Sequence, residues 1–87
     1  MPEPTAVQKS DRRWTIRFRP AERFGAVQCP EWAQAIAREH SAGAHVRLGH
    51  IGESGRLVEV VTVNRYRHRK RSEAVDVAKQ IVEAVEA

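Results

Sequence analysis

The sequence predicts an α+β fold with two layers, in which two helices cover one face of a three-stranded antiparallel sheet. Apolar and polar side chains alternate over residues 14–19, and two further strand patterns cover residues 44–51 and 56–66. Stripes of apolar residues at helical spacing begin near residues 30 and 72. The predicted order is therefore strand, helix, strand, strand, helix, and the helices bury their stripes against one face of the sheet. An alternative is a ferredoxin-like fold that lacks its last strand and borrows an edge from a second copy.

Eighty-seven residues are enough for one domain. Residues 1–12 contain two prolines and show no apolar period, so we expect a disordered N-terminal arm followed by a single domain over residues 13–87. Leu, Ile, Val and Phe account for 19 of the 87 residues, so the predicted core is small and dimerisation would enlarge it.

The first predicted strand, residues 14–19, directs Trp14, Ile16 and Phe18 to the core and Arg17 and Arg19 to solvent. Its solvent face is therefore basic. Pro20 ends the strand because proline cannot donate to a ladder. Residues 20–28 are interpreted as a connection that Phe24 and Val27 hold against the core.

The first helix is expected to start near Pro30 and to stop at Gly43, which can adopt the left-handed conformation. Trp32, Ile36 and His40 recur every four residues with Ala33 and Ala37 beside them, which predicts that Trp32 and Ile36 are buried.

The two central strand patterns differ in clarity. Residues 44–51 place Val46 and Leu48 inward and Arg47 outward, and a glycine-bounded turn follows at residues 52–55. The valine-rich residues 57–63 fit no single face, so the strand has either a bulge or two partly covered faces. Ser72 is expected to cap the last helix. The buried stripe of that helix is predicted to be Ala74, Val75, Ala78, Ile81, Val82 and Val85.

Positive charge is concentrated where the last strand meets the last helix. The net charge is +4, yet residues 56–71 carry six basic side chains and one acidic one. Five of those basic side chains fall within seven residues, and we call this set the basic junction: Arg65, Arg67, Arg69, Lys70 and Arg71. Such a concentration attracts phosphate or another anion.

Other functions find little support. Cys29 is the one thiol, and no nucleophile, base and orienting group occur in a recognisable pattern, so we expect no enzyme. Cys29, His40, His45 and His50 lack the close pairing of structural zinc ligands, so neither a metal nor another cofactor is predicted. No apolar run approaches the length of a membrane span and no signal peptide opens the chain, which predicts a cytoplasmic protein. The Ala/Arg/Val-rich composition is typical of a GC-rich bacterial or phage genome.

The favoured function is binding of nucleic acid, DNA or RNA, through the phosphate backbone of a duplex. Arginine matches phosphate oxygens with two parallel donors, and the amides at a helix N-terminus add further donors. Tyr66 is the one aromatic residue in the basic junction segment, so a platform for splayed bases is not expected. The predicted binding residues are Arg65, Arg67, Arg69, Lys70 and Arg71, with Arg17, Arg19 and Arg47 from the open sheet face.

Residues 31–87 resemble a double-stranded-RNA-binding domain, whose order is helix, three strands, helix. In that family the last helix opens with Lys-Lys-x-Ala-Lys, and the lysines contact phosphates across the major groove. Arg71 matches one of these lysines, and Ala74 and Ala78 match the packing alanines. Ser72 and Val75 replace the other two lysines, and the family's Gly-Pro-x-His hairpin and one strand are absent. The resemblance implies docking on duplex RNA.

A second hypothesis is a protein-interaction module, such as a phage- or plasmid-borne inhibitor, adaptor or regulator. Its basic face would dock on an acidic protein surface, or its valine-rich third strand would pair edge to edge in a homodimer. The acidic last helix could then meet the basic junction of the second copy.

Overall fold

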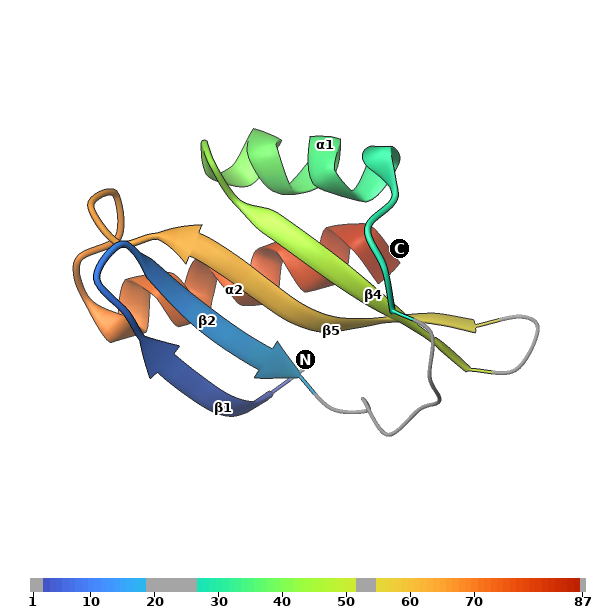
Figure 1. The fold of residues 1–87 in the computed structure, drawn as a ribbon, viewed down its shortest axis with the longest axis horizontal. Helices are drawn as coiled ribbons and strands as arrows, with labels where there is room; N and C mark the ends of the chain where they lie inside the picture. Colours follow the sequence, from blue (N-terminus) through green and yellow to red (C-terminus); the bar gives the residue numbers. More distant parts are fainter. Residues whose placement is uncertain (1–2, 19–26, 52–54, 87) are drawn as a thin grey trace.

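The computed structural model describes residues 3–18, 27–51 and 55–86. Its two helices and antiparallel sheet confirm the α+β class, but the sheet is larger than the three strands predicted (Figure 1). Four strands have six residues or more, and a fifth has only two. The elements are β1 (Pro4–Lys9), β2 (Arg13–Phe18), β3 (Val27–Gln28), α1 (Glu31–His40), β4 (His45–Ile51), β5 (Gly55–Asn64) and α2 (Arg71–Glu86).

The prediction that residues 1–12 form a disordered arm is wrong for β1, which pairs antiparallel with β2 from Ala6↔Arg17 to Lys9↔Trp14. β1 is an edge strand whose side chains are exposed or half-buried, so it shows no clear period in the sequence. Pro4 occupies its first position, where a missing donor is tolerated. The Lys9 ammonium lies 5.9 Å from the centre of the Trp14 ring, a cation–π contact that fastens β1 to the core.

The strand order is β1-β2-β5-β4-β3, and every neighbouring pair is antiparallel. β5, the valine-rich strand, is therefore central and has β2 on one side and β4 on the other. This position contradicts the idea that the valine-rich strand pairs edge to edge with a second copy, because β2 and β4 occupy its two sides over residues 60–62.

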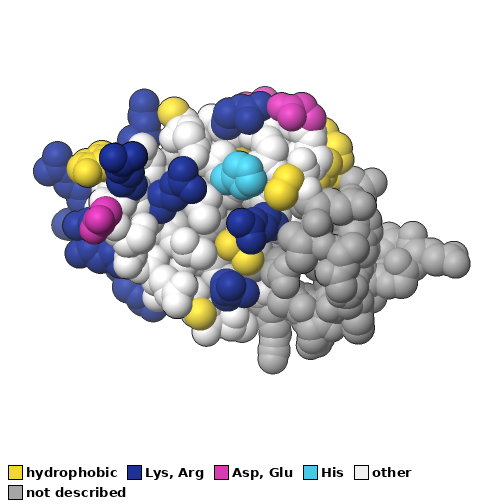
Figure 2. Space-filling model, in the orientation of Figure 1, with side chains coloured by type: hydrophobic (Ala, Val, Ile, Leu, Met, Phe, Trp, Pro, Cys, Tyr) yellow, Lys and Arg dark blue, Asp and Glu magenta, His cyan; other side chains and the backbone are white. Residues whose placement is uncertain are grey.

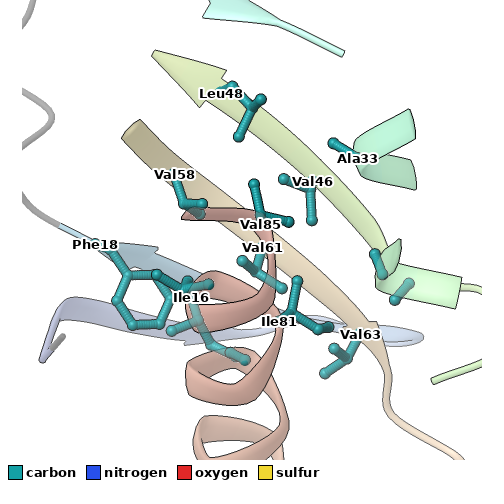
Figure 3. Close-up of a cluster of buried hydrophobic side chains, with 14 of the residues drawn as sticks. Ile16, Phe18, Ala33, Val46, Leu48, Val58, Val61, Val63, Ile81 and Val85 are labelled. Atoms are coloured by element: carbon teal, nitrogen blue, oxygen red, sulfur yellow. The ribbon is translucent and has the colours of Figure 1, made fainter. Parts of the chain in front are cut away.

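One continuous core lies between the sheet and both helices (Figure 3). Trp14, Ile16 and Phe18 are buried as predicted, as are Val46 and Leu48 on β4. α2 packs across β5 and β2, while α1 packs on β4 and on α2. From α2 the predicted stripe is buried except for Val75, which is half-buried: Ala74, Ala78, Ile81, Val82 and Val85.

The prediction for α1 is wrong at Trp32, and the buried side of the helix is centred on the neighbouring alanines instead. Trp32 is 41% exposed, whereas Ala33, Gln34 and Ala37 are buried and Ile36 is half-buried. The small side chains of Ala33 and Ala37 meet a helix whose own contact residues include alanines, and this allows the two helices to approach closely. A tryptophan on that side of α1 would hold them apart.

β5 contains a bulge, which resolves its irregular pattern. Arg47 of β4 pairs with Val60, but the next residue, Leu48, pairs with Val58, so β5 has one extra residue between these pairs. The extra residue changes the alternation, and Val58 and Val61 both face the core although they are three positions apart. Val60 therefore faces the opposite side of the sheet.

The helix ends are close to their predicted places. Gly43 has φ +82°, the left-handed conformation expected after α1. α2 begins at Arg71, one residue before Ser72, which was expected to be its cap. The Lys70 carbonyl accepts the first helical hydrogen bond, from the Ala74 amide at 3.1 Å.

Candidate nucleic-acid interface

The connection between β5 and α2 is a short turn whose backbone is held by Asn64. The Asn64 Oδ1 accepts hydrogen bonds from the amides of Tyr66 at 2.7 Å and Arg67 at 3.3 Å. The Asn64 carbonyl also accepts from the His68 amide at 3.1 Å. Asparagine is favoured in such turns because its side chain reaches the backbone two residues on. The segment that carries the basic junction thus starts from a defined conformation.

His68 ties the middle of this segment to the rest of the fold. Its carbonyl accepts a 2.7 Å hydrogen bond from the Trp14 indole, which is buried in β2 and needs a partner. Its Nε2 lies 2.7 Å from the hydroxyl of Ser41, just after α1. No pattern in the sequence marks His68 as an anchor, because both of its partners are distant in the chain.

Arg65 has a structural role in addition to the one predicted. Its Nη1 donates to the carbonyls of Ser10 at 2.7 Å and Asp11 at 3.2 Å, and its amide donates to the Arg12 carbonyl at 2.9 Å. These bonds join the turn between β1 and β2 to the end of β5. One nitrogen of the Arg65 guanidinium is therefore already in use, and the other two form no hydrogen bond with the described residues.

The remaining members of the basic junction are exposed. Arg67, Arg69, Lys70 and Arg71 make no side-chain hydrogen bond or ion pair within the part of the chain that the structure describes. Figure 2 shows Lys and Arg side chains gathered at the end of the molecule where Figure 1 has the β5–α2 connection. Arg71 is also the first residue of the 16-residue α2, whose N-terminal amides carry partial positive charge.

The face of the sheet opposite the helices, which we call the open face, has a second group of cations. Arg17 of β2 and Arg47 of β4 are both directly opposite Val60 of β5, so all three side chains lie on the open face. The two arginines are exposed, whereas Val60 is only 7% exposed, as expected if the arginine stems lie over it. Two strand spacings put about 10 Å between the Cα atoms of Arg17 and Arg47. Arg19, the remaining predicted residue of this face, lies outside the described residues.

The two cationic groups share one side of the molecule. Val60, between the two arginines, and Arg65, where the basic junction starts, are five residues apart on and just beyond β5, a span of about 17 Å at 3.3 Å per residue. The row between them pairs Thr15 and His45 with Thr62, and it adds no negative charge. The ion pairs formed among the described residues, Arg38–Glu31 and Lys79–Glu3, leave both groups uninvolved.

Neither a cluster of metal ligands nor a membrane-spanning helix occurs among the described residues. Nowhere in residues 3–18, 27–51 and 55–86 do three His, Cys, Asp or Glu side chains meet as metal ligands would. Neither described helix has the length and apolarity required to span a bilayer. Cys29 is exposed and unpaired by any disulfide.

Comparison of the chain with protein-family models, with curated proteins and with solved structures found no match. The two cationic groups and the elements that hold them are therefore the features that point to a function.

Proposed function

We propose that this protein binds the phosphate backbone of a nucleic-acid duplex with the basic junction and with Arg17 and Arg47 of the open face. The observation that carries the proposal is the exposure of four cations: Arg67, Arg69, Lys70 and Arg71. Their backbone is held by the hydrogen bonds of Asn64 and His68. Side chains that form no ion pair within the described chain need not break one to meet a phosphate. A fixed backbone also lowers the entropy lost on binding.

The spacing of the two groups supports a duplex as the ligand. A duplex carries one charge per about 1.7 Å of its axis, so the roughly 17 Å from the open face to the basic junction corresponds to about ten phosphates. A ligand must therefore extend over at least that length to engage both groups. A duplex backbone does so without bending, whereas a small anion would meet only one group.

The experiment is a titration of labelled 16-base-pair DNA and RNA duplexes, followed by fluorescence anisotropy at several salt concentrations. The resemblance of residues 31–87 to double-stranded-RNA-binding domains is the reason to include RNA. With four to six phosphate contacts, the slope of log K against log salt should be about −3.6 to −5.4, so affinity falls roughly 150- to 2,000-fold between 50 and 200 mM salt.

Variants distinguish phosphate contacts made by the basic junction from a general effect of the protein's positive charge. Replacing Arg69, Lys70 and Arg71 by Ala should make the slope about 2.7 less steep, since each lost contact contributes about 0.9. Arg38→Ala is the matched control, because Arg38 is an exposed cation that pairs with Glu31 on α1. The proposal would be refuted if wild-type affinity did not change with salt, or if the triple variant had the same slope as Arg38→Ala. Binding of an acidic protein, with no binding of either duplex, would favour the interaction-module hypothesis.

A further inference from the structure

A cavity of about 270 Å³ opens within the basic junction itself, and Arg65, Tyr66 and Arg69 line it. Two large hydrophobic side chains are exposed in the described chain, Trp32 and Tyr66. Tyr66 is the more exposed of the two, at 68%. An aromatic ring that is this exposed, and that lines a cavity together with two arginines, has no packing role in the core. Its face is available to a flat ligand, and the cations beside it favour one that carries negative charge.

The walls of this cavity are fixed by bonds to the rest of the fold. The Tyr66 amide donates to Asn64 Oδ1 at 2.7 Å, and Arg65 Nη1 is held by the carbonyls of Ser10 and Asp11. The backbone that carries the ring and the Arg65 guanidinium therefore start from defined positions. Arg69, which is exposed, supplies the second cation of the cavity.

We propose that this cavity receives one unpaired nucleotide at the edge of a duplex, with its base on the Tyr66 ring and its phosphate at Arg69. This inference rests on the proposed function, because the duplex beside the nucleotide is held by the basic junction. Within a duplex the base must be unpaired to reach the ring, since both faces of an internal base pair are covered by its neighbours. Stacking on a single aromatic side chain tolerates any base and adds affinity without sequence readout.

The test compares three DNA hairpins with identical stems, each closed by a non-nucleotide linker so that no loop base is unpaired: one fully paired, one with a single bulged adenosine, and one with an abasic bulge. The two bulged hairpins have the same number of phosphates, so a difference between them measures the base alone. We expect the bulged adenosine to bind about 5- to 150-fold more tightly than the abasic bulge, the range for stacking one base on an aromatic side chain. Tyr66→Phe should keep this preference and Tyr66→Ala should lose it, while both variants bind the paired hairpin as the wild type does.

A second readout does not depend on affinity. 2-Aminopurine at the bulge should lose fluorescence when the wild type binds and keep it with Tyr66→Ala, because stacking on the ring quenches it. Circular dichroism of the variants checks the fold, which the exposure of Tyr66 should leave intact. Equal binding of adenosine and abasic bulges by the wild type would overturn the nucleotide site while leaving duplex binding in place. Failure to bind any of the three hairpins would overturn the proposed function itself.

Discussion

Gln34 is a buried polar residue whose side chain completes the sheet, and its replacement is a sharp test of how α1 and β4 are joined. Its amide Nε2 donates to the Val46 carbonyl at 2.5 Å, and its Oε1 accepts from the Val46 amide at 2.8 Å. β3 pairs with β4 only at Leu48 and Gly49, so it does not reach Val46. Gln34 thus provides to β4 the two hydrogen bonds that a longer β3 would have made.

Gln34→Leu keeps the approximate size of the side chain and removes both bonds. Gln34 is only 5% exposed and Val46 is fully buried, so water cannot easily replace the lost partner. An unsatisfied buried amide or carbonyl costs about 1–3 kcal/mol, so the Val46 amide and carbonyl together cost about 2–6 kcal/mol. The apolar leucine recovers part of this, and we expect a net loss of about 2–4 kcal/mol. A chain of 87 residues has a stability of about 4–13 kcal/mol at 0.05–0.15 kcal/mol per residue. The loss is therefore a large part of the total, and it should lower Tm by at least about 10 °C.

Urea unfolding at equilibrium measures the change, and Gln80→Leu is the matched control because Gln80 is exposed on α2. The control should lie within about 0.5 kcal/mol of the wild type. Hydrogen exchange gives the local readout, since the Val46 amide should lose protection in Gln34→Leu before the rest of the core does. A Gln34→Leu protein as stable as the control, with a protected Val46 amide, would refute the bridging role.

Two further predictions concern single positions. Arg65→Ala should lower the free energy of unfolding by about 1–2 kcal/mol through loss of the bonds to Ser10 and Asp11, while Arg67→Ala should change it by less than about 0.5 kcal/mol in the same urea titration. Gly43→Ala should cost about 1–2 kcal/mol by calorimetry, all of it from the left-handed backbone, because a Cβ at Gly43 would meet no atom within 4 Å. If Arg65→Ala or Gly43→Ala had the same free energy of unfolding as the wild type, the role assigned to that residue would be wrong.

The strands with a regular alternation could be predicted from the sequence. β2 and β4 each have one face in the core, so Trp14, Ile16, Val46 and Leu48 follow a period of two. β1 could not be predicted because an edge strand whose side chains are exposed or half-buried needs no such period. β3 could not be predicted because two residues are too few to form a pattern.

The error in α1 has a different origin. Trp32 and Gln34 lie on different sides of the helix, and hydrophobicity alone favours burial of the tryptophan. The structure buries Gln34 because its amide satisfies Val46, and it buries Ala33 and Ala37 because they fit closely against α2. Neither reason can be read along α1 itself, since each depends on a neighbour from elsewhere in the chain.

The charges of the candidate site could be predicted, but their division into two roles could not. A run of basic residues is visible in any sequence, whereas the bonds of Arg65 to Ser10 and of His68 to Trp14 join residues more than 50 positions apart. Such contacts follow from the antiparallel pairing of β2 with the central β5. The alternation within a strand indicates which face is buried, but it does not indicate which strands are neighbours.

This division of roles is what makes the basic junction suited to a phosphate backbone. Arg65 and His68 bond to other parts of the fold, while Tyr66, Arg67 and Arg69 between and beside them stay exposed. Cations on an unanchored loop would have to be ordered by the ligand, at a cost of about 1–2 kcal/mol for each backbone residue fixed. In this protein the backbone of the segment is already ordered by folding, so binding would restrict only the side chains. If the proposed function holds, the anchors contribute to affinity as well as to stability, because they order the backbone that presents the exposed cations.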